Sequence, residues 1–193
     1  AATMSGRVCL VTGATSGIGR VTAEALAARG ATTVLVGRDA ERARAAVEAI
    51  RDATGNPRID ALVGDLTIRD EVARLASDFR ARHDRLDVLV NNAGALFLKR
   101  RTSADGVEMT WALNHLAPFL LTNLLLDRLK QNAPARVVTV ASNAHSMGQI
   151  DFDDLQGERS YSGERAYNQS KLANVLFTYE LARRLQASAV TAN

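Results

Sequence analysis

The sequence of 193 residues has only one cysteine, three prolines and 5% aromatic residues. A single cysteine cannot form a disulfide within the chain, so a disulfide-stabilised secreted module is excluded and a reducing compartment is favoured. Cys9 lies inside an apolar run, where a cysteine is ordinarily a small buried residue. With 47% hydrophobic residues, the chain has enough apolar surface for one sizeable core. We therefore expect residues 1–193 to form a single globular domain.

Long apolar segments are missing as well. The longest one, from Leu116 to Leu126, is interrupted by Pro118, Thr122 and Asn123 and is too short to cross a bilayer. No positively charged segment followed by an apolar one opens the chain, as it would in a secretory leader. The expectation is a cytoplasmic protein without a membrane span.

Charge of one sign is also scarce, because 24 Lys and Arg stand against 21 Asp and Glu, a net charge of +3. Nucleic acid is therefore not an expected partner. Most basic residues are arginines that stand beside Asp and Glu, a pattern typical of solvated helix faces. The histidines His83, His115 and His145 are not spaced as metal ligands with a carboxylate or cysteine cluster, so no metal site is expected.

What the chain does contain is a regular alternation of short β-branched runs and longer amphipathic segments. The predicted strands are Val8–Thr12, Thr32–Val36, Arg58–Val63, Leu86–Val90 and Arg136–Val140. The predicted helices are Ile18–Arg29, Ala40–Thr54, Ile68–His83, Met109–Asn132 and Glu164–Gln186, with Asp39, Thr67 and Ser103 as candidate caps. This rhythm predicts an α/β fold, a doubly wound parallel sheet of the Rossmann type with helices on both faces. Residues 189–193 have the composition of a strand that has just begun, so we expect the fold to be truncated at its sixth strand.

A glycine-rich turn directly follows the first predicted strand. Residues 13–19 read Gly-Ala-Thr-Ser-Gly-Ile-Gly, and a helix is predicted to begin within them. Glycines let the backbone approach a pyrophosphate closely, and a helix N-terminus offers N–H groups and a partial positive charge. The residues predicted to bind the cofactor here are Gly13, Thr15, Ser16, Gly17, Ile18 and Gly19. A purely structural turn is the alternative interpretation.

The glycine spacing is G-x-x-x-G-x-G, and with it the chain resembles the short-chain dehydrogenase/reductase family. Two later motifs continue the resemblance, Asp65-Leu66 after the third strand and Asn91-Asn92-Ala93-Gly94 after the fourth. The resemblance implies that the adenine region and the rest of the cofactor contact Asp65, Leu66, Asn92, Ala93 and Gly94. All these motifs follow strand ends, where an open α/β sheet binds its ligand.

The residue after the second strand bears on the choice of cofactor. An NAD-specific site places a carboxylate there to accept from the ribose hydroxyls, whereas this chain has Arg38. An arginine can pair with a 2′-phosphate, so NADP is favoured over NAD. Asp39 follows at once and keeps NAD open, although it is also a natural helix cap.

Tyr167 and Lys171 are the candidate catalytic pair. Four residues apart on a predicted helix, they project from one face, and an ammonium close to a phenol favours the phenolate. Carbonyl reduction needs such a proton donor, because a hydride alone would leave an alkoxide. An exposed, merely stabilising helix contact is the alternative for this pair.

The resemblance supplies two further catalytic candidates. Ser142, after the fifth strand, corresponds to a serine that holds the substrate oxygen, and Asn114 to an asparagine that holds a water relaying protons to the lysine. It also implies that Tyr167 and Lys171 contact the cofactor, Lys171 at the nicotinamide ribose. From the residues alone, Ser142 fits a plain turn residue as well, and Asn114 fits a helix kink.

Residues 143–148, 155–158 and 167–177 are similar to the retinol-dehydrogenase-like branch of the family. The resemblance implies an NADP(H)-dependent oxidoreductase for a hydrophobic alcohol or carbonyl substrate, and a homodimer or homotetramer formed through long helices. A non-catalytic NADP(H)-binding sensor or regulatory protein is the alternative. A third hypothesis is that the chain without further closing elements binds cofactor weakly and does no chemistry.

Overall fold

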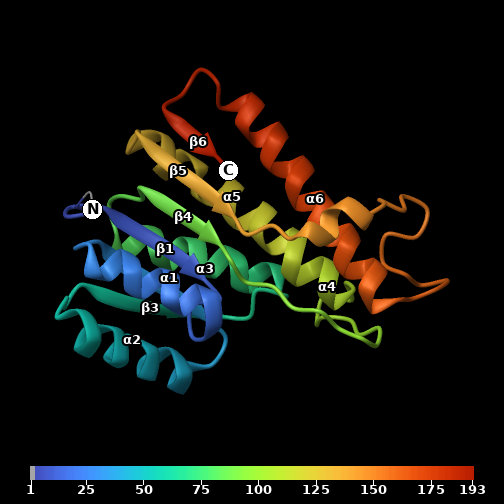
Figure 1. Ribbon diagram of the computed structural model, residues 1–193, viewed down its shortest axis with the longest axis horizontal. Helices are drawn as coiled ribbons and strands as arrows, with labels where there is room; N and C mark the ends of the chain where they lie inside the picture. The colour runs from blue at the N-terminus through green and yellow to red at the C-terminus, as the bar shows by residue number, and fades with distance from the viewer. Residues whose placement is uncertain (1–2) are drawn as a thin grey trace.

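Apolar runs of the chain form the strands of one parallel sheet, in a computed structural model that describes residues 3–193 (Figure 1). The strands are β1 Val8–Thr12, β2 Thr32–Gly37, β3 Ile59–Val63, β4 Val88–Asn91, β5 Ala135–Thr139 and β6 Val190–Ala192. Their order across the sheet is β3-β2-β1-β4-β5-β6. Because β1 pairs with both β2 and β4, the strand order reverses beside β1, where such sheets open a ligand crevice. The predicted fold class is confirmed. Residues 1–2 of the predicted domain lie outside the described residues.

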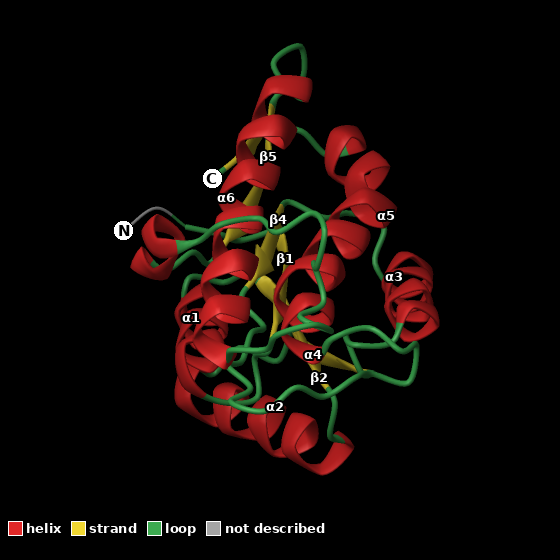
Figure 2. Cartoon of the chain, turned by 90° about the vertical axis from the view of Figure 1, so that its right-hand side faces the viewer, coloured by secondary structure: helices red, strands yellow, loops and turns green. Residues whose placement is uncertain are grey.

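Helices cover both faces of this sheet. They are α1 Gly17–Ala28, α2 Ala40–Thr54, α3 Arg69–Arg82, α4 Met109–Trp111, α5 Ala117–Gln131 and α6 Gly163–Arg184. On one face, α1 and α2 bury a core that includes Leu35 and Ile50. On the other face, α3, α5 and α6 bury a larger core around Phe79, Leu125 and Leu181. Figure 2 shows α1 on one side of the strands and α3 and α5 on the other. The central strands are therefore apolar on both faces, and all of β1 is buried.

The order of the predicted strands and helices is confirmed, and most ends differ by one or two residues. β4 begins two residues after the predicted Leu86, directly after Asp87, whose side chain bonds to the start of β1. Its carboxylate accepts from the Val8 N–H at 2.8 Å and from the Arg7 guanidinium at 2.6 Å. Cys9 is fully buried as predicted, and burial raises the pKa of its thiol to about 12. The strand expected at 189–193 forms as β6 and pairs with β5.

The predicted helix Met109–Asn132 is not one continuous α-helix, and the prediction was wrong near its beginning. After α4 the chain widens into a π-helical turn, η1 Ala112–Leu116, before α5 begins. Pro118 gives the physical reason, because proline has no N–H to donate and its ring crowds the preceding turn. Turns of this kind are frequently found at functional sites. This one contains Asn114.

The predicted cap of α2 is confirmed, because the Asp39 carboxylate accepts from the Arg42 N–H at 2.9 Å. The predicted cap Ser103 was wrong. The N-cap of α4 is Glu108, whose buried carboxylate accepts from the Thr110 N–H at 2.9 Å. A carboxylate at this place also interacts favourably with the positive end of the helix dipole.

The third predicted cap, Thr67, was also wrong, because α3 is capped by a residue from another loop. Asp105 accepts a hydrogen bond from the Arg69 N–H at 2.6 Å. The Thr67 hydroxyl donates to Asp65 instead, at 2.7 Å. The cap therefore ties the loop before α4 to the beginning of α3.

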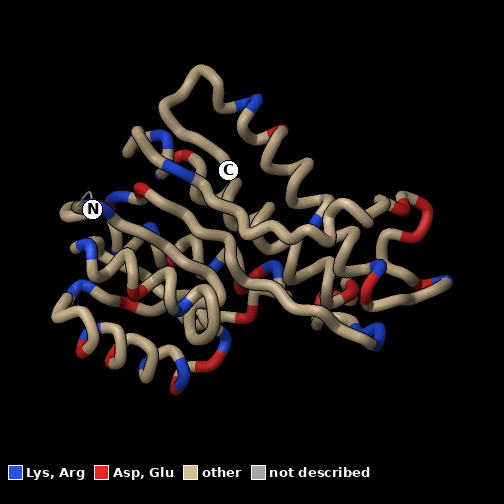
Figure 3. The backbone as a smooth tube through the Cα atoms, viewed as in Figure 1, with Lys and Arg blue, Asp and Glu red and all other residues tan. Residues whose placement is uncertain are grey.

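Basic and acidic residues are interspersed along the exposed helices (Figure 3). On α2, Arg44 pairs with Glu41 at 2.8 Å and with Glu48 at 3.2 Å. Exposed pairs of this kind contribute little to stability, and they confirm the predicted solvated helix face. Within residues 3–193, no helix combines the length and the apolar character that a bilayer crossing requires.

Candidate active site

The glycine turn after β1 lies at the carboxyl edge of the sheet, against the segment that follows β4 (Figure 1). A Cβ on Gly13 would lie 2.9 Å from the Cα of Ala93, and a Cβ on Gly19 would collide with the Asn92 amide and the Gly13 carbonyl. The Asn92 amide also donates to the Thr12 carbonyl at 2.9 Å. The two loops interlock without room for a side chain, which is why glycine is needed here.

The first turn of α1 fits the phosphates of a dinucleotide. Among the described residues, the Ser16 side chain makes no capping hydrogen bond to the backbone N–H groups of this turn. The first turn also carries no acidic residue that would repel a phosphate. Gly17 has a φ of +54°, and no heavy atom lies within 4 Å of the place of a Cβ there. The first N–H groups of a helix have no partner within it and lie at the positive end of its dipole, so this turn has the features that phosphate binding requires.

β2 ends beside this turn. A Cβ on Gly37 would contact the methyl group of Thr15, so the end of β2 and the glycine turn touch. Arg38 follows and is exposed, and within residues 3–193 it has no salt-bridge partner. Asp39 is engaged as the cap of α2. Among the described residues Arg38 is therefore free of an ion pair and could contact the 2′ group of a cofactor, whereas the Asp39 carboxylate already has a partner.

β3 brings the predicted pair Asp65 and Leu66 to the same edge. The Asp65 carboxylate accepts from the Thr67 N–H at 2.8 Å, which closes the turn into α3. Leu66 is only 8% exposed and packs into the larger core. Cofactor contacts by this pair stay predictions. Asp65 is more exposed to solvent than Leu66.

Tyr167 and Lys171 lie on one face of α6, one turn apart. Lys171 is buried, its ammonium donates to the Val140 carbonyl at 2.9 Å, and its Nζ lies 5.6 Å from the centre of the Tyr167 ring. That distance is within the range of a cation–π contact. Burial lowers the pKa of the Lys171 ammonium. The lysine is therefore an inward-facing cation beside the phenol, and an exposed helix contact is excluded.

Ser142 lies two residues beyond Val140 and begins the short 3-10 helix η2 Asn143–Met147. Its hydroxyl accepts from the Ala144 N–H at 3.2 Å, and its carbonyl contacts His145 Nδ1 at 2.6 Å. Gly148, after η2, packs so tightly against α6 that a Cβ would lie 2.8 Å from the Cβ of Leu172. The segment that carries Ser142 is thus seated on the helix that carries Tyr167.

Asn114 is buried in the π turn, facing the loop after β4. Its Nδ2 donates to the Ala95 carbonyl at 3.0 Å and its Oδ1 accepts from the Ala95 N–H at 2.9 Å. A Cβ on Gly94 would lie 3.3 Å from Asn114 Oδ1 and 3.7 Å from Lys171 Nζ. Gly94 therefore lies close to both Asn114 and Lys171, and Lys171 is one turn from Tyr167 on α6.

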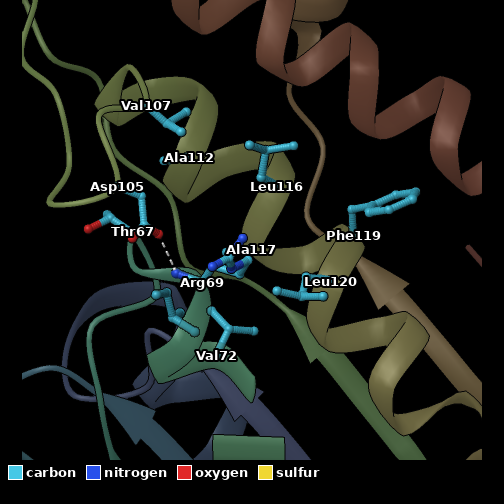
Figure 4. Close-up of a pocket in the computed structure, with 11 residues that line it drawn as sticks. Thr67, Arg69, Val72, Asp105, Val107, Ala112, Leu116, Ala117, Phe119 and Leu120 are labelled. Carbon is cyan, nitrogen blue, oxygen red and sulfur yellow. Dashed lines mark hydrogen bonds between the residues drawn. The ribbon is translucent and has the colours of Figure 1, made fainter. Parts of the chain in front are cut away.

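An apolar cavity of about 400 Å³ lies beside this site, between the β3–α3 turn and the beginning of α5 (Figure 4). Val72 of α3 lines one side, and Leu116 and Leu120 line the other. None of the predicted catalytic residues lines it, and Leu66 is the one predicted cofactor residue that does. Ala112 and Leu116 of the π turn line this cavity, and Tyr167 does not.

Two residues of this site were missed by sequence reasoning. The Thr12 hydroxyl accepts from the N–H groups of Asn92 and Ala93, both at 3.0 Å, and so joins the ends of β1 and β4. Asn174 is 3% exposed on α6, one turn beyond Lys171. The signal for Asn174 was present, because Tyr167, Lys171 and Asn174 form a polar stripe at helical spacing.

Among the described residues, no group of three or more His, Cys, Asp or Glu side chains is placed to hold a metal ion. The site instead combines a glycine-rich turn at a helix N-terminus with a buried lysine beside a tyrosine. That combination, on a doubly wound parallel sheet, defines a dinucleotide-binding α/β protein.

The family profile described as short chain dehydrogenase matches residues 7–193. The chain is similar to human retinol dehydrogenase 13, with 48% identity over 193 residues, which are 100% of this chain and 58% of the relative. The chain therefore belongs to the short-chain dehydrogenase/reductase family of nicotinamide-dependent oxidoreductases, in its retinol-dehydrogenase-like branch. It thus spans less than two thirds of that relative's length.

Solved structures agree with this assignment. An uncharacterized protein from Mycobacterium paratuberculosis superposes with a TM-score of 0.88 at 41% identity, over 99% of this chain and 68% of that one. The RhlG/NADP active-site complex of Pseudomonas aeruginosa superposes with a TM-score of 0.80 at 31% identity, over 99% and 72% of the two chains.

Proposed function

We propose that this chain is the coenzyme-binding and catalytic part of an NADP(H)-dependent oxidoreductase for hydrophobic alcohols or carbonyls. One observation carries the proposal: the buried Lys171 ammonium is held by the Val140 carbonyl and lies beside the Tyr167 ring. A buried cation costs stability, so its retention beside a phenol is best explained by acid–base chemistry.

A bound nicotinamide coenzyme supplies or accepts the hydride. The Tyr167 phenol gives a proton to the carbonyl oxygen during reduction and takes it back during oxidation. The Ser142 hydroxyl donates a hydrogen bond to the same oxygen, and the Lys171 charge stabilises the phenolate. Asn114, which lies close to Gly94 as Lys171 does, anchors the path by which protons reach the lysine.

A hydrophobic substrate is supported by the side chains around the site. Leu98 is 81% exposed on the loop after β4, and Met147 and Phe152 are 68% and 81% exposed on the loop after β5. Both loops follow strand ends at the edge that carries Tyr167. Exposed apolar groups gathered at one edge are typical of a surface that binds an apolar ligand. The name of the similar human protein points to an alcohol of this kind.

NADP as the preferred coenzyme is supported by the charges at the end of β2. Arg38 is exposed next to the glycine turn, whereas the Asp39 carboxylate is already bonded to the Arg42 N–H. An unpaired guanidinium favours a phosphate on the ribose. The similar Pseudomonas aeruginosa protein was solved as an NADP complex.

Arg38→Asp is expected to weaken NADPH binding by a factor of about 10 to 100, the value of a charge-assisted hydrogen bond, with no loss for NADH. Nicotinamide fluorescence titrations of both coenzymes measure this change. The matched control is Arg29→Asp, the same charge change at an exposed position before β2, where the amino ends of the strands lie. If both variants weakened NADPH binding equally, the effect would come from the net charge of the protein and not from a contact of Arg38.

The proposal as a whole is tested by titrating the protein with NADPH and NADH and then adding a panel of hydrophobic aldehydes and ketones. We expect NADPH to bind at least about tenfold tighter and one class of carbonyl to drive its oxidation. The same assay on a chain extended past Asn193 serves as the comparison. Tight binding without turnover in both forms would favour a coenzyme sensor, and absence of binding would refute the assignment of the glycine turn.

We also propose that the chain pairs with a second copy through α5 and α6. Phe119, Leu176 and Tyr179 are 46%, 50% and 72% exposed on these helices, and the Phe119 and Phe177 rings lie 5.3 Å apart. Light scattering is expected to give a dimer or tetramer that Phe119→Asp converts to monomers, because a charge in an apolar interface is costly. Phe152→Asp, at an exposed loop position, is the control. An unchanged mass for Phe119→Asp would exclude this interface.

A further inference from the structure

The carbonyl of Asn114 lacks the donor that a helix ordinarily provides. In an α-helix it would accept from the N–H of residue 118, and Pro118 has none. In the π turn the bonding is shifted by one residue, and the Ala117 N–H donates to the Ala112 carbonyl. A buried carbonyl needs a hydrogen-bond partner, and one that loses its α-helical donor can take it from another element.

Asn174 of α6 supplies it. Its Nδ2 donates to the Asn114 carbonyl at 2.7 Å, between residues 60 positions apart, and both side chains are buried. A carbonyl oxygen only accepts, so the nitrogen of the Asn174 amide must be the atom that faces it. The orientation of this amide is therefore determined by its partner.

The other end of the same amide contacts His115, the next residue of the π turn. Asn174 Oδ1 lies 3.0 Å from His115 Nδ1. Since Oδ1 only accepts, the imidazole must carry a proton on Nδ1. His115 is further held by its contact with the Trp111 ring, with centroids 4.6 Å apart. The Asn174 amide thus forms hydrogen bonds with two consecutive residues of the π turn, Asn114 and His115.

What the π turn presents to the site is the side chain of Asn114. Besides its paired bonds to Ala95, Asn114 Nδ2 donates to the Ser170 hydroxyl at 3.1 Å, and Ser170 is the neighbour of Lys171 on α6. The Asn114 main chain is held by Asn174, and its side chain holds the loop beside Gly94. Loss of the Asn174 hydrogen bond would therefore move Asn114, and with it the groups that surround Lys171.

We infer that Asn174 is a positioning residue: by donating to the Asn114 carbonyl it holds the π turn, and through Asn114 the Ala95 loop, in the geometry that the reaction uses. The inference rests on the proposed function for its catalytic consequence and on the hydrogen bonds alone for its structural part. Asn174 acts through Asn114 and is not assigned a contact with substrate or coenzyme.

The structural part is tested by amide hydrogen exchange of the full chain, which needs no turnover. In Asn174→Ala and Asn174→Asp, the Ala95 amide is expected to exchange at least about tenfold faster, while the Leu10 amide of β1 keeps its protection. Aspartate is nearly isosteric and still accepts from His115, but it has no N–H for Asn114. The control is Asn123→Ala, whose amide donates to Phe119 on its own helix at 2.7 Å. Wild-type protection of Ala95 in Asn174→Ala would overturn the inference.

The catalytic part is tested by separating turnover from binding in the same variants. Both are expected to lower kcat by about tenfold or more, with the NADPH dissociation constant within about twofold of wild type. A lowered melting temperature with unchanged kcat would mean a merely structural role, and wild-type kcat in Asn174→Asp alone would assign the role to the His115 contact. Either result overturns the inference. If the wild-type chain binds NADPH but turns over no carbonyl, the proposed function fails, while the exchange of Ala95 still decides whether Asn174 positions Asn114.

Discussion

Tyr167→Phe is expected to lower kcat by a factor of about 10² to 10⁴, the range for loss of a general acid–base group, while NADPH still binds. The substitution removes only the phenol oxygen and keeps the ring that the Lys171 ammonium approaches to 5.6 Å. Coenzyme binding through the glycine turn is therefore left intact. Stopped-flow or steady-state oxidation of NADPH, combined with a fluorescence titration, measures both quantities.

The control for this variant is Tyr179→Phe, which makes the same chemical change at a 72% exposed position of the same helix. Turnover by Tyr167→Phe at the wild-type rate would show that another group donates the proton. The variant also separates the enzyme from a coenzyme sensor. A sensor would keep its biological activity after this substitution, because it needs binding and not proton transfer.

Gly19→Ala is expected to weaken NADPH binding by at least about tenfold and to lower the free energy of unfolding by about 1–3 kcal/mol, the range for overpacking. The added Cβ would collide with the Asn92 amide and the Gly13 carbonyl, so the glycine turn and the loop after β4 must move apart. That movement disturbs both the phosphate site and the Asn92 bond to Thr12. Urea unfolding and coenzyme titration measure the two effects.

The matched control is Gly106→Ala, at a glycine with φ of +75° and no heavy atom within 4 Å of a Cβ. That variant adds a methyl group and some backbone strain, about 1–2 kcal/mol, without a steric collision. Its coenzyme binding is expected to equal that of wild type. If Gly19→Ala bound NADPH as tightly as Gly106→Ala, interlocking of the two loops would be unnecessary for the site.

The π turn shows where local sequence patterns stop predicting the structure. The apolar spacing of residues 109–132 is helical throughout, so it predicts one continuous helix. The observed break depends on Pro118, which has no N–H for the Asn114 carbonyl, and on Asn174, which lies 60 residues beyond Asn114 and donates to that carbonyl. A periodic pattern indicates which side chains are buried. It does not indicate that the amide of a distant residue, here Asn174, will donate to a backbone carbonyl of the helix.

The caps of the helices illustrate the same limit. Asp39 lies next to the helix it caps, and it was predicted. Asp105 caps α3 from 36 residues away, which no local motif indicates. Glu108 was missed in favour of Ser103, because serine is among the preferred N-cap residues and glutamate is not. The choice among them depends on burial, and Glu108 is also bonded to the Tyr161 hydroxyl at 3.1 Å.

The sequence by itself determined the order of strands and helices, the glycine turn after β1 and the four-residue spacing of Tyr167 and Lys171, because all of these depend on local periodicity and on neighbours along the chain. Only the tertiary structure decided that Lys171 is held by Val140 and that Asn174 bonds the Asn114 carbonyl. These bonds join segments that meet only when the sheet and its helices pack. Each buried polar group then has to find a partner among the atoms that packing brings within reach.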